Sequence, residues 1–248
     1  DEVLRVENLS TETGVKNVSF SIRSGEVLGF AGLVGAGRSE VMRGIFGIDN
    51  LTGGTVYIDG KPVSIRRPED AISYGMGFVP EDRKEQGLIL GMTVDENLSL
   101  ANLGNLNRFG VLDSRKERRI TLKYMKDLRI KAVDENQITS GLSGGNQQKV
   151  VVGKWLSTEP RILILDEPTR GIDVGAKAEI YHLINDLTDQ GVAIQLISSE
   201  LMEIIAMSDR ILVMHNGEYK GEIDSENVTQ ERIMSLALST EKSDAEEN

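Results

Sequence analysis

The first third of the chain alternates short apolar stretches with turn residues, which is the pattern of β-strands. Strands are expected at Val3–Val6, Val18–Ile22 and Glu26–Ala31. Thr55–Ile58 shows the alternating pattern of a strand. It is followed by Asp59-Gly60, a pair that favours a hairpin into Lys61–Ile65. These segments predict an antiparallel β patch beside a core strand.

A helical spacing replaces the strand pattern in the middle of the chain. Ser114 and Glu117 have the spacing of a capping box, and Ile120, Tyr124 and Leu128 follow at helical intervals. We therefore expect residues 92–157 to be mostly helical.

Buried strands and helices alternate beyond residue 158, which predicts a parallel sheet with right-handed crossovers. The expected elements are Ile162–Leu165, a helix near 175–189, Ala193–Ile197, a helix near 200–207, and Ile211–Met214, followed by an Asn216-Gly217 turn. The sequence thus predicts one domain over residues 1–240, with a core of residues 1–91 and 158–240 and an inserted helical subdomain at 92–157. Residues 241–248 are mostly charged and polar, and we expect a disordered tail.

Composition excludes several kinds of chemistry. The 248 residues include no Cys, so disulfides, thiolate metal sites and Cys nucleophiles are excluded. The two His residues lie far apart in the sequence, which disfavours a His-rich metal site. Lys and Arg number 28 against 39 Asp and Glu, a net charge of −11 that disfavours nucleic acid as a partner. The longest apolar runs have only strand length. Because the chain begins at Asp1, we expect it to be a piece of a longer protein.

A glycine-rich loop follows the apolar strand at Glu26–Ala31 and precedes an expected helix at Glu40–Phe46. It reads Gly32, Leu33, Val34, Gly35, Ala36, Gly37, Arg38 and Ser39. This is the spacing of a phosphate-binding P-loop, with Arg38 where Lys is expected. The glycines let backbone N–H groups turn toward phosphate oxygens, and the helix N-terminus adds a positive dipole. Ser39 can offer its hydroxyl to Mg²⁺. Arg38 keeps the charge but brings a larger, planar group.

Two further segments carry candidate chemistry. The strand Ile162–Leu165 ends in Asp166, which can hold Mg²⁺, and Glu167, which can orient or deprotonate an attacking water. Ser143 is a natural helix N-cap, and Gly144 and Gly145 after it leave backbone N–H groups bare. Glycines are costly inside a helix, so an anion docking on this helix end explains them better than structure alone.

The order of these motifs resembles that of ABC-transporter nucleotide-binding domains, and the resemblance covers essentially the whole chain. The segment Leu142–Lys149, which resembles the signature motif of the family, and the segment Asp166–Lys177 are the most specific to this family. They look like the C-terminal half of a tandem ATPase from a bacterial monosaccharide importer. Gly87–Val94 and Ser198–Leu201 are most similar to the ribose-type subgroup. The resemblance implies a RecA-like α/β core with a mainly parallel sheet. It implies ATP and Mg²⁺ as ligands, with nucleotide contacts also from Glu81, Gln147, Asp173 and Ser199.

The chain departs from the family pattern at four nucleotide-handling positions. Arg38 replaces the P-loop Lys, Glu81 the Q-loop Gln and Ser199 the switch His, and no aromatic residue that could stack on adenine precedes Phe20. The resemblance implies two domains joined head to tail, each ATP lying between one P-loop and the partner's signature. We expect this half to contribute Ser143, Gly144 and Gly145 to a working site on the other half, while its own P-loop site is degenerate.

The resemblance also implies the remaining partners. The segment from Glu81 to Lys84 and the helices after Thr93 are expected to face membrane-spanning permease subunits, with a periplasmic sugar-binding protein as an indirect partner. The domain is then peripheral, at the cytoplasmic face of the bacterial inner membrane. The leading interpretation is an ATP-driven half of a monosaccharide importer, with ribose suggested by the subgroup. A nucleotide-sensing or scaffolding module that binds ATP without productive hydrolysis stays open as the alternative.

Overall fold

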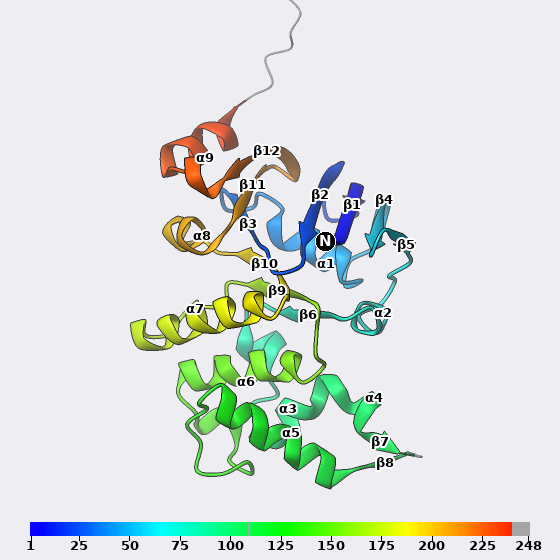
Figure 1. Ribbon diagram of the computed structural model, residues 1–248, viewed down its shortest axis with the longest axis vertical. Coiled ribbons are helices and arrows are strands. Elements are labelled where there is room, and N and C mark those ends of the chain that lie inside the picture. The colour runs from blue at the N-terminus through cyan, green and yellow to red at the C-terminus, as the bar shows by residue number, and fades with distance from the viewer. Residues whose placement is uncertain (109, 240–248) are drawn as a thin grey trace, which may run out of the picture.

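Two β-sheets and a group of helices make up the described part of the chain, which in the computed structural model is residues 1–108 and 110–239 (Figure 1). The tail expected to be disordered therefore lies outside the described residues. The strands are β1 (Glu2–Thr11), β2 (Val18–Arg23), β3 (Val27–Gly32), β4 (Leu51–Ile58), β5 (Lys61–Val63), β6 (Met76–Val79), β7 (Asn107–Arg108), β8 (Val111–Leu112), β9 (Ile162–Asp166), β10 (Ala193–Ile197), β11 (Arg210–His215) and β12 (Glu218–Asp224). The α-helices are α1 (Arg38–Ile45), α2 (Pro68–Ser73), α3 (Val94–Ser99), α4 (Leu103–Leu106), α5 (Ser114–Asp127), α6 (Gly144–Leu156), α7 (Val174–Asp189), α8 (Leu201–Met207) and α9 (Gln230–Leu238). Among the described residues, no helix combines the length and the apolar character needed to cross a membrane.

The central sheet has six strands in the order β12-β11-β3-β10-β9-β6. All neighbouring strands are parallel except β12, which runs antiparallel to β11. Side chains of β3, β9 and β10 are buried on both faces, as expected for a parallel sheet covered on both sides. The predicted parallel core is confirmed, with two additional edge strands, β6 and β12, that the hydrophobic pattern did not indicate.

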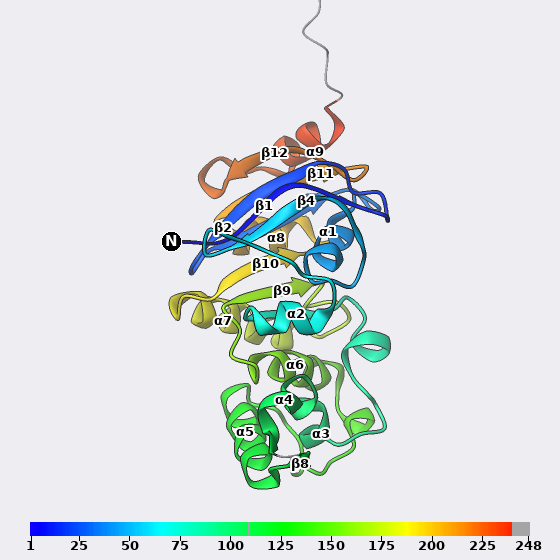
Figure 2. The same ribbon diagram turned by 90° about the vertical axis from the view of Figure 1, so that its right-hand side faces the viewer.

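The antiparallel patch is a four-stranded sheet in the order β2-β1-β4-β5. Strand β1 is longer than predicted and pairs with both β2 and β4. Helix α1 packs between this sheet and the central one, where Val41, Met42 and Ile45 are fully buried. Figure 2 shows the antiparallel strands lying across α1. This packing holds α1, and with it the glycine-rich loop, at the carboxyl end of β3.

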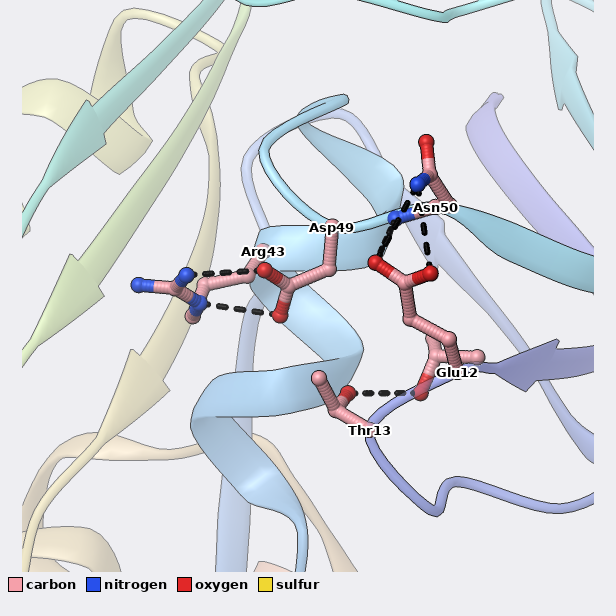
Figure 3. A network of polar contacts seen from close by, with 6 residues as sticks. Glu12, Thr13, Arg43, Asp49 and Asn50 are labelled. Atoms are coloured by element: carbon pink, nitrogen blue, oxygen red, sulfur yellow. Dashed lines mark hydrogen bonds and ion pairs between the residues drawn. The ribbon is translucent and has the colours of Figure 1, made fainter.

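Two polar pairs fix the loop that follows α1 (Figure 3). The Arg43 guanidinium donates to both carboxylate oxygens of Asp49, at 2.9 and 2.7 Å. The Asn50 amide nitrogen donates to both oxygens of Glu12, at 3.1 and 3.2 Å. The C-terminal end of α1 is thereby tied to the loop that follows β1.

Helices α3 to α6 gather at one end of the molecule, away from the antiparallel sheet (Figure 1). Residues 92–157 are mostly helical, as predicted, with a two-strand hairpin of β7 and β8 between α4 and α5. The predicted capping box at Ser114 is wrong. Asp113 is the N-cap of α5 and accepts from the backbone N–H groups of Arg115 and Lys116. The Glu117 side chain turns away from the helix end and accepts from Ser99 Oγ at 2.8 Å.

Candidate functional site

The glycine-rich loop lies between the end of β3 and the start of α1. Gly35 and Gly37 have φ values of +78° and +95°, a region that non-glycine residues rarely adopt. Gly37 is the residue before α1, and its backbone also meets the β11–β12 turn, because a Cβ on Gly37 would lie 2.9 Å from Gly217 Cα. The Gly217 N–H in turn donates to the Ala36 carbonyl at 2.9 Å. The loop is thus shaped by glycine and held by a neighbouring turn.

A cavity of about 400 Å³ opens in front of this loop. It is lined by Val34, Gly35, Ala36, Gly37, Arg38, Ser39, Glu40, Glu81, Glu167, Arg170 and Ser199. The predicted P-loop residues from 34 to 39 therefore lie together with Glu81, Glu167 and Ser199. Gly32 and Leu33 form the entry to the loop, and a Cβ on Gly32 would lie only 2.5 Å from the Met214 carbonyl oxygen. Backbone N–H groups at the start of α1 and the helix dipole make this cavity suited to phosphate.

Asp166 ends β9 directly before Glu167, is 3% exposed, and is not itself among the residues that line the cavity. Burial raises the pKa of its carboxyl to about 7, and a hydrogen bond from Ser39 acts in the opposite direction. Its buried Oδ1 atom has no hydrogen-bond partner among the described residues. A buried acceptor without a partner is costly unless a ligand completes it. An orphaned carboxylate oxygen beside a serine hydroxyl is a donor set that fits Mg²⁺.

Glu167 follows directly and takes the left-handed conformation, with a φ of +50°. Its backbone N–H donates to the Ile197 carbonyl at 2.9 Å, and its Oε2 accepts from Ser199 Oγ at 3.0 Å. Burial raises the pKa of the Glu167 carboxyl, while Ser199 and Arg38 lower it. A carboxylate with a raised pKa, facing a cavity, can accept a proton from a bound water.

The cationic groups of the cavity are turned toward protein atoms. Arg38 Nη1 donates to the Ser198 carbonyl oxygen at 2.8 Å. Arg170 forms an ion pair with Glu81 across the cavity. Sequence reasoning missed Arg170, and the one available signal was its position three residues after Glu167.

The signature residues lie on a separate surface. Ser143 caps α6, accepting from the Asn146 N–H as predicted. A Cβ on Gly145 would lie 2.7 Å from Ala176 Cβ at the start of α7, where Asp173 is the N-cap. Ser143, Gly144, Gly145 and Asp173 do not line the cavity described above. Gln147 is buried, and its amide donates to the Thr139 carbonyl at 3.3 Å, so the structure does not bring it to the cavity.

Arg83, expected in a segment facing membrane subunits, turns its side chain toward the loop after β9. Its guanidinium donates to the carbonyls of Arg170 and Gly171, at 2.8 and 3.3 Å. It also borders the signature, because a Cβ on Gly144 would lie 2.9 Å from Arg83 Nη2. Arg83 therefore connects the segment after β6 with the loop after β9 and the start of α6.

The fold and the cavity define a P-loop nucleotide-binding domain of α/β architecture. Its mainly parallel sheet, antiparallel sheet and helical region agree with the predicted fold class. The sequence profile described as ABC transporter matches residues 15–170, and the chain belongs to this family.

Known proteins support the same assignment. The chain is 53% identical over 237 residues to the ribose import ATP-binding protein RbsA of Geobacillus kaustophilus and 49% identical over 237 residues to that of Bacillus subtilis. Each match covers 96% of this chain and 48% of the relative, so the chain spans about half the length of these curated relatives. The ATP-binding cassette MJ0796, solved as a dimer with ADP and phosphate, superposes with a TM-score of 0.77 at 26% identity, over 90% of this chain and 98% of that one. A nucleotide-free cassette of an ABC transporter superposes with a TM-score of 0.81 at 24% identity, over 97% of this chain and all of that one, and shows the shared fold.

Proposed function

We propose that this chain is one ATP-binding half of a bacterial monosaccharide importer, and that the transported sugar is ribose. The observation that carries the proposal is the cavity in front of the glycine-rich loop, which Glu167 lines, together with the buried, unpartnered Oδ1 of Asp166 one residue earlier in the chain. The names of the relatives support ribose as the sugar. Assignment to the C-terminal half of a tandem ATPase stays a prediction from the signature segments.

The chain's own residues have distinct parts in handling nucleotide. Backbone N–H groups of residues 33–35 and 37–39 bind the phosphates of ATP, while the Ala36 N–H donates to the Leu33 carbonyl within the loop, and the N-terminus of α1 favours the phosphate charge. Ser39 Oγ and Asp166 Oδ1 would hold Mg²⁺, which when bound neutralises charge on the phosphates. Glu167 is the residue that would accept a proton from an attacking water in any turnover at this site, and Ser199 holds its carboxylate in place through a 3.0 Å hydrogen bond.

The proposal includes a degenerate P-loop site in this half. Three contacts support it: Arg38 is engaged by the Ser198 carbonyl, Glu81 is paired with Arg170, and a serine hydroxyl stands at the switch position. The signature of this half, Ser143 to Gly145, completes the site of a second cassette in a head-to-tail dimer. Membrane-spanning permease subunits bind the dimer at the cytoplasmic face of the inner membrane, and a periplasmic protein delivers the sugar.

The experiment compares Mg-ATP hydrolysis by this chain alone with hydrolysis by the chain combined with a cassette that has a lysine-containing P-loop. Little turnover is expected alone, and clear turnover is expected in the mixture. Gly144→Ala in this chain should abolish the turnover of the mixture while the chain still folds, because the new methyl group meets the flexible end of Arg83 at 2.9 Å. Gly91→Ala is the matched control, since nothing lies within 4 Å of its Cβ position.

Brisk hydrolysis by the chain alone that Glu167→Gln abolishes would overturn the degenerate site and make this half a motor in its own right. The second candidate, a scaffolding or sensing module, is favoured by the engagement of Arg38 outside the loop. It predicts ATP binding by this chain without any effect of Gly144→Ala on turnover in the mixture.

A further inference from the structure

Glu203 is a buried carboxylate of α8, 5% exposed, that does not line the cavity. Its Oε1 accepts from the Thr169 hydroxyl at 2.7 Å, and its Oε2 accepts from the Ser198 hydroxyl. Thr169 lies two residues after Glu167, and Ser198 lies immediately before Ser199. The Glu203 side chain therefore joins the loop after β9, which carries Glu167, to the loop after β10, which carries Ser199.

Ser198 connects Glu203 to two residues of the cavity, Arg38 and Glu167. Its hydroxyl also accepts from the Glu200 backbone N–H at 3.0 Å, so both hydrogen-bonding roles of this hydroxyl are used. Its carbonyl oxygen is the acceptor for Arg38. The next residue, Ser199, donates to Glu167. Moving the Ser198 side chain would therefore disturb both the Arg38 and the Glu167 contacts.

Close packing sets the position of Glu203 itself. Helix α8 lies directly on β3, where Gly29 has no side chain. A Cβ on Gly29 would lie 2.2 Å from Ser208 Oγ and 2.9 Å from Ile204 Cγ2. Tyr181 of α7 lies near the same carboxylate, since burial together with the charge of Glu203 raises the pKa of Tyr181 to about 12.

We propose that Glu203 is a positioning residue that sets the distance between Glu167 and Ser199 by holding Thr169 and Ser198 on its two carboxylate oxygens. The proposal rests on the proposed nucleotide-binding function. Glu203 would thereby act on the end of the cavity that Glu167 and Ser199 form, where the terminal phosphate of a bound ATP would lie. Of the P-loop, the Arg38 side chain is linked to Glu203 through Ser198, whereas the backbone N–H groups of Gly35 and Gly37, which would bind the inner phosphates, form no hydrogen bond with either residue.

Glu203→Gln tests this with the least change of shape. A glutamine offers one acceptor oxygen where the carboxylate has two, and its NH₂ group can only donate. Two hydroxyl donors at the two oxygens can then no longer both be accepted. At least one of the hydroxyls of Thr169 and Ser198 therefore loses its charged acceptor, and it has to turn to accept a weaker hydrogen bond from the NH₂ group instead.

Two measurements separate positioning from general destabilisation. The first is hydrogen–deuterium exchange of the nucleotide-free chain, in which Glu203→Gln should speed exchange of the amides of residues 167–170 and 198–200 and leave β1 and β4 unchanged. The second is calorimetric binding of Mg-ATP and Mg-ADP. The variant should bind ATP about tenfold more weakly, the equivalent of one hydrogen bond to a charged group, with ADP affinity unchanged. Glu226→Gln, an exposed substitution of the same chemistry, should change neither measurement.

The result that would overturn the proposal is unchanged exchange in both loops, or an equal loss of ATP and ADP affinity. If Glu203→Gln fails to fold, Thr169→Val with Ser198→Ala keeps the test open, because it removes the two donors and leaves the carboxylate. That double variant should reproduce the selective loss of ATP affinity, and retained affinity would contradict the proposal. If the parent chain binds neither nucleotide, the proposed function fails, while the exchange result still decides whether Glu203 anchors the loops.

Discussion

Lys154 is a buried cation without a carboxylate partner among the described residues, and replacing it with methionine should alter the pH dependence of stability. Its side chain lies in α6, 6% exposed, and its Nζ donates to the Gly87 carbonyl at 2.5 Å. Burial lowers the pKa of Lys154 from 10.5 to about 8. Methionine has a similar length and no charge, so it removes the buried cation with little change in packing.

The magnitude follows from the two pKa values. A lowering from 10.5 to about 8 corresponds to about 3 kcal/mol by which the charged form is disfavoured in the folded protein. Below pH 8 the parent carries this full cost. Between pH 8 and 10.5 the unfolded chain binds more protons than the folded one, so the parent gains stability as the pH rises, and above pH 10.5 the cost is gone.

Methionine also loses the hydrogen bond and leaves the buried Gly87 carbonyl unpaired, at a cost of about 1–3 kcal/mol that is nearly independent of pH. Lys154→Met should therefore equal or exceed the parent in stability by up to about 2 kcal/mol at pH 7, and it should be less stable than the parent at pH 10.5. The difference between the two pH values, about 3 kcal/mol, does not contain the hydrogen-bond contribution.

Urea unfolding followed by circular dichroism at several pH values between 7 and 10.5 measures this difference. Lys126→Met, an exposed substitution on α5, is the matched control and should show no pH-dependent change relative to the parent. A free-energy difference between parent and Lys154→Met that stays constant from pH 7 to 10.5 would refute the argument from burial.

Three other substitutions test the packing around the site by urea unfolding. Gly153→Ala in α6 should destabilise the chain by about 1–3 kcal/mol in spite of its better helix propensity, because its Cβ would lie 2.6 Å from a leucine methyl group of α3. Arg43→Ala should cost about 1–3 kcal/mol by leaving Asp49 unpaired, and the same change in a chain with Asp49→Ala should cost clearly less; equal costs would contradict the pairing. Gly217→Ala should destabilise by more than Gly60→Ala and should also weaken Mg-ATP binding. Both glycines have positive φ, but a Cβ on Gly217 would lie 2.1 Å from the Gly14 carbonyl oxygen, whereas Gly60 has nothing within 4 Å.

The P-loop and the strand before Asp166 could be predicted because their information is local. The spacing of the glycines predicts the loop, and an apolar run followed by two carboxylates predicts the strand and the position of its end. The six-stranded sheet was predicted only in part. Strand β6 has just four residues, one of them Gly77, and so offers too short a pattern to distinguish from a loop.

Other features depend on contacts that the sequence does not show. Asp113 and Ser114 are both good N-caps, and the choice between them depends on Glu117, which bonds to Ser99 across the helical region instead of closing a capping box. Arg170 and Glu203 reach partners 89 and 34 residues away, so their roles appear only when the chain is folded.

Trp155 is the one tryptophan of the chain, and its place gives the molecule a built-in optical probe. The core has two hydrophobic clusters, one between the central and antiparallel sheets and one between the central sheet and the helices on its other face, and the indole packs against both. Its ring is nearly perpendicular to that of Phe46, with the ring centroids 5.5 Å apart. Its emission therefore arises from a single environment at the boundary between the central sheet and the helical region. A shift of this emission would record separation of the two clusters. Trp155 does not line the cavity in front of the glycine-rich loop, so ligand binding in that cavity would make no direct contribution to the signal.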